Sequence, residues 1–279
     1  MIGAGRVGTA VALLLRRAGW TLVGVASRSD DSARRASERT GAPVFPLEGA
    51  IPEADLYVIG ATDEGIGALA ATLSGRLPAG SIALHLSGSL GTEVLGPLAA
   101  QGVKTCALHP VQACPDIETA LRRLPGSAWG VTCAPDLDKW ARDLVVEVFD
   151  GTPISVPEEA RTLWHASSVM TSNGISALLA FGEDLLRSLG IEDPGRVLGP
   201  LAAGTVANAR EGGGGHATLT GPIARGEVNT VVRHMEVLRI EHPDLLHGYR
   251  LVAASILEAA ERAGKLDASV AEAMREALG

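Results

Sequence analysis

The first residues of the chain carry a glycine pattern that could bind the phosphates of a dinucleotide. The spacing is G-x-G-x-x-G, and the residues that we assign to cofactor binding are Gly3, Gly5, Arg6, Val7 and Gly8. In a turn that leads from a strand into a helix, such glycines let the backbone approach a pyrophosphate, and the helix N-terminus supplies open N–H groups and positive potential. The apolar spacing of the following residues predicts that helix.

A second pattern, Ser27-Arg28-Ser29, ends the strand predicted at residues 21–27. An NAD-specific site has Asp or Glu at this position to bind the ribose hydroxyls. Arg28 between two hydroxyls suits a 2′-phosphate instead, since the guanidinium is a planar cation with several donors. The pattern therefore favours NADP(H), with NAD(H) as the alternative cofactor. The other interpretation of Arg28 is an exposed side chain in an ordinary loop.

Three further groups follow apolar runs that are predicted to be strands: Ala61-Thr62-Asp63, Ser87 and His109. Ligands of open α/β sheets bind at the carboxyl ends of the strands, so we expect these groups to meet there. The first should lie beneath the cofactor ribose and nicotinamide, and Ser87 beside the nicotinamide. An imidazole with an ordinary pKa near 6.5 can give a proton to a carbonyl oxygen. The alternatives are that Thr62 or Asp63 caps a helix and that His109 bonds a loop carbonyl.

A helix predicted at residues 157–189 carries polar side chains in its N-terminal half. His165, Ser168 and Ser172 share one helical face, and Asn173 lies close to it. Such a face is expected in a cleft between domains. We assign His165 as the second candidate proton donor with Asn173 beside it, and Ser168 and Ser172 as candidate substrate contacts. The alternative for His165 is a buried side chain that bonds a backbone carbonyl.

Arg225 lies in the first turns of a helix predicted from Thr220 to about Glu241. Its guanidinium could bind a substrate carboxylate through two hydrogen bonds, reaching in from a partner subunit. The alternative is an ion pair with Glu227.

Composition narrows the class of protein. The 279 residues suffice for two compact domains, and 24 basic against 32 acidic residues give a net charge of −8. With no basic run, we expect no nucleic-acid partner. No apolar run could span a membrane and no secretory signal is present, so we expect a cytoplasmic protein without a membrane partner. The three cysteines lack metal-site spacing, so no metal is expected.

The order of elements predicts the fold. Short β-rich runs alternate with helical stretches up to residue 155, and only helical patterns follow. We therefore predict a doubly wound, mostly parallel Rossmann-type α/β domain at residues 1–155 and an all-α substrate and dimerisation domain at residues 156–279. The predicted strands are 21–27, 43–45, 55–62, 81–88, 104–109, 128–133 and 153–156.

Only Met1 and Ile2 precede the glycine turn, where a doubly wound sheet has its central strand. Loss of that strand would leave buried N–H and C=O groups unpaired, at about 1–3 kcal/mol each. We therefore expect the natural chain to begin upstream with a β-branched run.

The motifs in this order resemble a known family. They are the glycine turn, SRS, DLYVIGATD, HLSGSLG, LHPVQ, WHASSVMTSN and LTGPIARGE. Together they are similar to bacterial proteins that pair a Rossmann-like domain with the domain of unknown function 2520, relatives of pyrroline-5-carboxylate reductase, deazaflavin-dependent NADP oxidoreductases and 6-phosphogluconate dehydrogenase. The resemblance covers nearly the whole chain. It implies a nicotinamide-binding N-domain, a helical C-domain and a homodimer formed through the helices.

The resemblance also implies an oxidoreductase activity, but this chain departs from the motifs of related enzymes at two positions. Ser87 and His109 match residues that face the substrate hydroxyl in prephenate dehydrogenases, but the lysine of that motif is absent. In β-hydroxyacid dehydrogenases a lysine acid stands four residues before Asn173, where this chain has Val169. His109 or His165 would then supply the proton.

The function that we predict is an NADP(H)-dependent oxidoreductase that reduces a carbonyl or imine of a small carboxylate. Because some proteins of this type look like ketopantoate reductases, a 2-keto acid is the first candidate substrate. The alternative is a non-catalytic NADP(H)-binding sensor or regulatory module, which the absent lysine and the short start favour.

Overall fold

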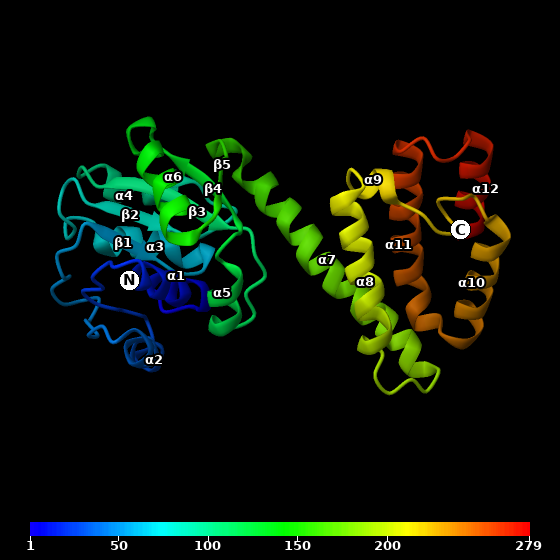
Figure 1. The fold of residues 1–279 in the computed structure, drawn as a ribbon, viewed down its shortest axis with the longest axis horizontal. Coiled ribbons are helices and arrows are strands. Elements are labelled where there is room, and N and C mark those ends of the chain that lie inside the picture. Colours follow the sequence, from blue (N-terminus) through cyan, green and yellow to red (C-terminus); the bar gives the residue numbers. More distant parts are fainter. The chain divides into compact units, whose positions relative to one another are not determined.

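The computed structural model describes residues 1–279, which form two compact units, residues 1–172 and 173–279 (Figure 1). The strands of the first unit are β1 (Leu56–Ile59), β2 (Ile82–His85), β3 (Lys104–Pro110), β4 (Ala128–Cys133) and β5 (Thr152–Ser155). Its helices are α1 (Arg6–Arg17), α2 (Asp30–Thr40), α3 (Asp63–Leu73), α4 (Gly96–Ala99), α5 (Ile117–Arg123) and α6 (Pro135–Phe149), with the 3-10 turns η1 (Thr92–Leu95) and η2 (Glu158–Ala160). Helix α7 (Arg161–Ser188) begins in the first unit and continues into the second, which also contains α8 (Gly195–Glu211), α9 (Gly215–Thr218), α10 (Val228–Glu241), α11 (Pro243–Arg262) and α12 (Ala268–Leu278).

The five strands form one sheet in the order β1-β2-β3-β4-β5. All neighbours are parallel except β3 and β4, which are antiparallel. Beyond β1, Ile2 forms single bridges to Ala26 and to Ile59, and Val25 bridges to Val44. The strands predicted at 21–27 and 43–45 are therefore reduced to isolated bridges. The predicted mostly parallel, Rossmann-type sheet is confirmed.

Helices cover both faces of the sheet. Val58 of β1 and Leu84 of β2 pack into a buried cluster with residues of α1, α5 and α6. The alternating residues Tyr57 and Ile59 point to the other face and pack against α3 and α4. This alternation follows from the period of two residues along a strand. The result is a three-layer unit in which the strand ends are the places left open to a ligand.

The second unit contains only helices, as the sequence predicts. Helices α10, α11 and α12 enclose a core that includes Val231, Leu257 and Met274. The helix expected from Thr220 begins instead at Val228, so that prediction is wrong for residues 220–227, which form turns. Gly221 and Gly226 there have φ angles of 108° and 73°, which an α-helix does not allow. No helix combines the length and hydropathy that crossing a lipid bilayer requires.

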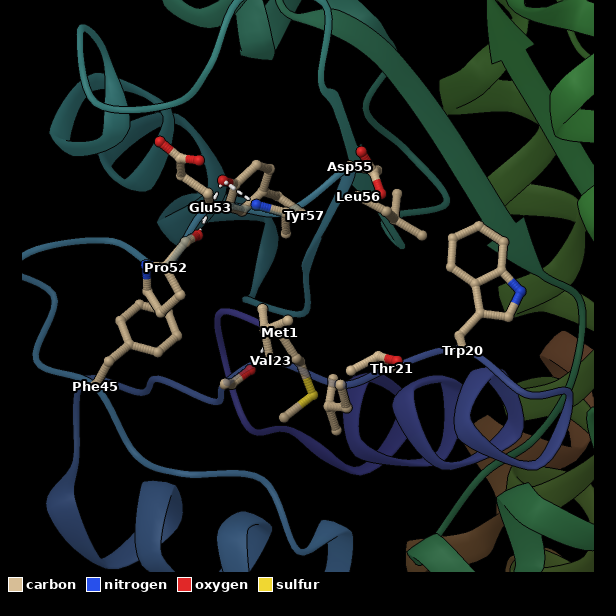
Figure 2. Close-up of a pocket in the computed structure, with 13 residues that line it drawn as sticks. Met1, Trp20, Thr21, Val23, Phe45, Pro52, Glu53, Asp55, Leu56 and Tyr57 are labelled. Carbon is tan, nitrogen blue, oxygen red and sulfur yellow. Dashed lines mark hydrogen bonds between the residues drawn. The ribbon is translucent and has the colours of Figure 1, made fainter.

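A pocket of about 280 Å³ lies at the amino ends of the parallel strands (Figure 2). Met1, Trp20 and Phe45 contribute apolar surface to its walls. The hydroxyl of Tyr57 accepts a hydrogen bond from the Ala54 N–H and donates one to the Pro52 carbonyl, both at 3.0 Å. We call it the amino-end pocket. Its lining includes no histidine and no residue of an α-helix.

Candidate functional site

A second pocket, of about 380 Å³, lies at the carboxyl ends of β1, β2 and β3. We call it the carboxyl-end pocket. Ten of the residues singled out in the sequence line it together: Gly5, Arg6, Val7, Gly8, Ala61, Thr62, Asp63, Ser87, His109 and His165. The expectation that strand ends distant in sequence meet at one site is thus met for these residues.

The glycine turn forms one wall of this pocket. Gly5 is the N-cap of α1 and has no side chain to cap it, so the N–H groups of the first helical turn stay open. A Cβ at Gly3 would lie 2.7 Å from the carbonyl carbon of Gly60, and one at Gly8 would lie 3.2 Å from the Gly60 Cα. The backbones therefore touch, which only glycine permits. This cradle of bare backbone and open N–H groups fits a pyrophosphate.

The Ser27-Arg28-Ser29 segment lies beside the glycine turn and does not line the pocket. The Gly3 N–H donates to the Ala26 carbonyl at 2.8 Å, one residue before Ser27. Arg28 is exposed, and Ser29 is the N-cap of α2, where its Oγ accepts the Ser32 N–H at 3.5 Å. A cationic side chain thus stands next to the turn with its guanidinium in solvent.

Asp63 and Ser87 belong to one hydrogen-bond network. The Ser89 hydroxyl donates to the Asp63 carboxylate, and the Ser87 Oγ accepts the N–H groups of Ser89 and Leu90 at 3.2 and 3.1 Å. Burial alone would raise the pKa of Asp63, but hydrogen bonds from Ser89 and Ser87 outweigh it and hold the pKa below its ordinary value. Thr62 is the N-cap of α3, yet its side chain makes no capping bond. The network keeps a negative charge at the pocket.

Two residues that the sequence analysis did not assign hold the loop after β2. His85 is fully buried, with Nε2 2.8 Å from the Gly91 carbonyl and Nδ1 3.2 Å from the Ser87 nitrogen. Arg161, at 1% exposure, donates to the carbonyls of Ser87 and Leu90 and, at 3.2 Å, to that of Gly130. Burial lowers the pKa of the Arg161 guanidinium. A buried positive charge thus stands under the pocket.

His109 and His165 lie together in the pocket. Their ring centroids are 5.7 Å apart and their planes nearly perpendicular, at 88°. The Trp164 indole N–H donates to His109 Nδ1 at 3.0 Å, so the alternative of a bond to a loop carbonyl is not realised. Burial, reinforced by the positive charges of Arg161 and His165, lowers the pKa of His109 to about 4. His109 is therefore neutral at ordinary pH.

The remaining candidates lie outside this pocket. The Ser168 hydroxyl donates to the Trp164 carbonyl at 3.2 Å, and Ser172 is the last residue of the first unit. Asn173 opens the second unit, where Arg225 pairs with Glu227 at 2.6 Å, the alternative considered above. Their roles in substrate binding and catalysis stay predictions.

A sequence signal for the missed residues exists. Arg161, Trp164 and His165 are spaced i, i+3 and i+4, so they share one helical face from the start of α7. Gly60 and Gly88 close apolar strand runs, and each marks a close approach: a Cβ on Gly88 would lie 2.8 Å from His109 Nε2. Spacing predicts the shared face, but the partner of each residue on it comes only from the fold.

Comparisons with known proteins agree with this architecture. A family profile described as a Rossmann-like domain matches residues 1–110, and one described as Domain of unknown function (DUF2520) matches residues 127–256. No curated protein matches the sequence.

Solved structures share the fold at low sequence identity. A candidate NADP oxidoreductase of Bacteroides fragilis is 22% identical over 91% of this chain and 95% of its own, with a TM-score of 0.76. A reductive aminase of Aspergillus terreus, in complex with NADPH and ethyl levulinate, is 19% identical over 99% and 97%, with a TM-score of 0.65. An imine reductase of Myxococcus stipitatus, in complex with NADP⁺, is 16% identical over 97% of each chain, with a TM-score of 0.62. At these identities the likeness shows the fold, whereas the two profiles together cover both units. The chain therefore belongs to the family of proteins that pair a Rossmann-like domain with a DUF2520 domain.

Proposed function

We propose that the protein is an NADP(H)-dependent oxidoreductase that reduces the C=O or C=N bond of a small carboxylate substrate. The observation that carries this proposal is a single pocket that joins a phosphate-binding cradle to two histidines. A cradle alone would fit any nucleotide-binding protein. Polar groups that converge beyond its phosphate end indicate chemistry at that end.

The residues present fit the cofactor. Gly5 to Gly8 would hold the pyrophosphate, Thr62 and Asp63 would line the ribose and nicotinamide, and Arg28 with Ser27 and Ser29 would hold the 2′-phosphate. NADPH, when bound, supplies a hydride to the substrate carbon. The chain's own contribution is to orient the reacting group, to hold the charge that develops on its oxygen or nitrogen and to deliver a proton to that atom.

The substrate proposal rests on analogy and on charge. A ketopantoate-like 2-keto acid is the first candidate, and the names of the similar structures add imines to the class. Arg225 would bind the carboxylate from a second subunit, exchanging its pairing with Glu227 for a bidentate one.

We also propose a homodimer formed through the helical unit. Helix α8 buries none of its residues, and Val197, Leu201 and Val206 are exposed on it. Leu178, within the second half of α7, and Leu189, just beyond its end, are exposed as well. Apolar surface of this extent is typical of an interface. Light scattering should give a dimer for the parent chain and a monomer for Leu201→Glu; a monomeric parent would contradict the proposal.

The decisive experiment is an activity screen with a binding measurement beside it. The protein is titrated with NADPH and NADH and then offered 2-keto acids and cyclic imines. We expect NADPH to bind and to be oxidised only when a substrate is present. The competing function, a sensor or regulatory module that binds NADP(H) without turnover, is favoured by Val169 in place of a lysine. NADPH binding without oxidation across the whole screen would establish that alternative.

A further inference from the structure

We propose that Trp164 fixes His109 as a neutral imidazole that donates a hydrogen bond from Nε2 to the reacting oxygen or nitrogen of the substrate, and that His165 is the proton donor. This inference rests on the proposed function and assigns separate roles to the two histidines. It also gives a positioning role to Trp164.

The hydrogen bond from Trp164 determines the tautomer of His109. An indole N–H is a donor only, and it lies 3.0 Å from His109 Nδ1. Nδ1 must therefore be the unprotonated nitrogen that accepts this bond. In a neutral imidazole the proton then lies on Nε2. The side chain is thus set as an Nε2–H donor.

Contacts with the sheet hold the Trp164 indole in place. His109 of β3 is paired directly with Gly130 of β4. A Cβ on Gly130 would lie 2.8 Å from Cε2 and Nε1 of Trp164, so the indole ring lies flush against the strand next to His109. Arg161, one helical turn earlier, bonds the Gly130 carbonyl at 3.2 Å and fixes the start of α7 on the same strand. The Trp164 position is therefore determined by the sheet.

The charged groups around His109, together with its burial, determine its protonation. Arg161 and His165 of α7 oppose a positive charge on it, and Asp63 of α3 favours one. Burial opposes the positive charge more strongly than either of them, and the balance lowers the pKa of His109 to about 4. A neutral imidazole gives up its Nε2 proton with great difficulty, so His109 can polarise an oxygen but cannot serve as the acid.

The second ring nitrogen of His109, Nε2, is available to a ligand. Nε2 makes no hydrogen bond within the protein, and it faces the glycine of Ser87-Gly88-Ser89, where a Cβ would lie 2.8 Å away. The same Cβ would lie 2.5 Å from His165 Cδ2. The absence of a side chain at Gly88 thus lets both imidazoles pack close to this loop, and both rings line the carboxyl-end pocket. A substrate atom bound in that pocket could meet both.

NADPH, when bound, would supply a hydride to the substrate carbon, so the electron pair of the C=O or C=N bond would move to the oxygen or nitrogen. His109 Nε2–H holds that atom by a hydrogen bond. His165, as imidazolium, transfers its proton to the atom and becomes neutral, to be protonated again from water. The Asp63 carboxylate lines the same pocket as His165.

The direct test is the tautomer itself, which needs no substrate. Histidine ring nitrogens are labelled with ¹⁵N in the full chain, and long-range ¹H–¹⁵N spectra are recorded from pH 8 to pH 5 without cofactor. His109→Gln identifies the signals of His109. We expect a neutral ring protonated on Nε2 over this range. A ring protonated on Nδ1, or on both nitrogens at pH 6, would overturn the proposal.

Trp164→Phe tests the positioning role. It removes the indole N–H while keeping an aromatic ring, so His109 should become a mixture of tautomers. Trp20→Phe makes the same exchange in the amino-end pocket and should leave the His109 signals as in the parent. Unchanged His109 signals in Trp164→Phe would show that the indole does not set the tautomer.

Kinetics separate the two histidines. His109→Gln keeps an N–H donor and should retain kcat within about tenfold, whereas His109→Leu should lose about 10²–10³-fold, the cost of one oxyanion donor. In the parent, kcat should fall at alkaline pH as the donor loses its proton, and His165→Gln should have a low kcat without that fall. Equal losses in His109→Gln and His109→Leu would overturn the assignment, as would an alkaline fall that disappears in His109→Gln alone. A protonated Nε2 in a protein without turnover would instead contradict the reductase function and leave the tautomer standing.

Discussion

The two ends of one sheet carry pockets of similar size but different chemistry. The amino-end pocket is lined by Met1, Trp20 and Tyr57 among others, and the Tyr57 hydroxyl bonds the Ala54 N–H and the Pro52 carbonyl (Figure 2). The carboxyl-end pocket is lined by the N-termini of α1 and α3 and by two histidines. The difference arises from the direction of the parallel strands. Each right-handed crossover begins a helix at the carboxyl end, so open N–H groups gather there.

The comparison shows that volume alone does not mark a functional site. Apolar side chains such as Met1, Trp20 and Phe45 line the amino-end pocket, and neither a helix N-terminus nor a histidine contributes to it. At the carboxyl end, glycines bring backbones into contact, Arg161 is buried beneath the loop after β2, and His109 keeps Nε2 free. Features of this kind, a buried charge and a neutral buried histidine, are concentrated at functional sites. Changes at the two ends should therefore have different consequences.

The largest expected effect is that of Gly8→Ala on NADPH binding. Its Cβ would lie 3.0 Å from the Gly3 carbonyl oxygen and 3.2 Å from the Gly60 Cα, so α1 must move away from the turn. A strain of about 2–3 kcal/mol corresponds to about a hundredfold rise in the NADPH Kd. Calorimetric titration measures it. Gly96→Ala, at a helical glycine with open space around its Cβ position, is the matched control and should bind as the parent; a parent-like Kd for Gly8→Ala would show that the turn is not the phosphate site.

The sequence predicts much of this end of the sheet and little of the other. The glycine spacing and the strand ends place Gly5, Asp63 and His109 at one edge, because parallel strands have their carboxyl ends together. It does not predict the bond from Trp164 to His109, since that contact depends on which strand α7 packs against. The boundary of α10 was missed for a local reason, the positive φ of Gly221 and Gly226. Sequence patterns predict the helix face or sheet edge on which a residue lies. Its contacts with residues of other elements depend on how those elements pack.

The second effect concerns stability against pH. Since the folded pKa of His109 is about 4 and an unfolded histidine has a pKa near 6.5, the unfolded chain binds more protons between these values. His109 therefore stabilises the fold fully above pH 6.5, and this contribution is lost as the pH falls toward 4. Over the whole interval this contribution to the free energy of unfolding amounts to about 3 kcal/mol.

Urea unfolding at pH 7 and pH 5 measures this difference. His109→Gln, which does not titrate, should show a smaller loss of unfolding free energy between the two pH values. An identical loss in the variant and the parent would contradict the neutral, buried state of His109.

A smaller effect is expected at Arg28, which lies beside the glycine turn and is exposed. Arg28→Ala removes a cation that would bind the 2′-phosphate of NADPH. NADH has no 2′-phosphate and therefore makes no such contact. A charge-assisted hydrogen bond of about 1.4 kcal/mol gives a tenfold rise in the NADPH Kd. The NADH Kd should stay unchanged. Arg17→Ala, at the far end of α1, is the control for net charge, and equal losses for both cofactors in Arg28→Ala would remove the 2′-phosphate assignment.

The smallest effect is predicted at the amino-end pocket, where Tyr57→Phe removes a hydroxyl that bonds the Ala54 N–H and the Pro52 carbonyl. The loss of these bonds should lower the unfolding free energy by about 1 kcal/mol, and the NADPH Kd and kcat should match those of the parent. Thermal unfolding and titration on one preparation measure both quantities. If Tyr57→Phe altered the NADPH Kd by tenfold at unchanged stability, the two ends of the sheet would be coupled, and the division of roles between the pockets would be wrong. Since Tyr57 and Ile59 point to one face of β1 and Val58 to the other, and only the residues after Ile59 reach the cofactor cradle, we expect the strand to isolate the two ends from each other.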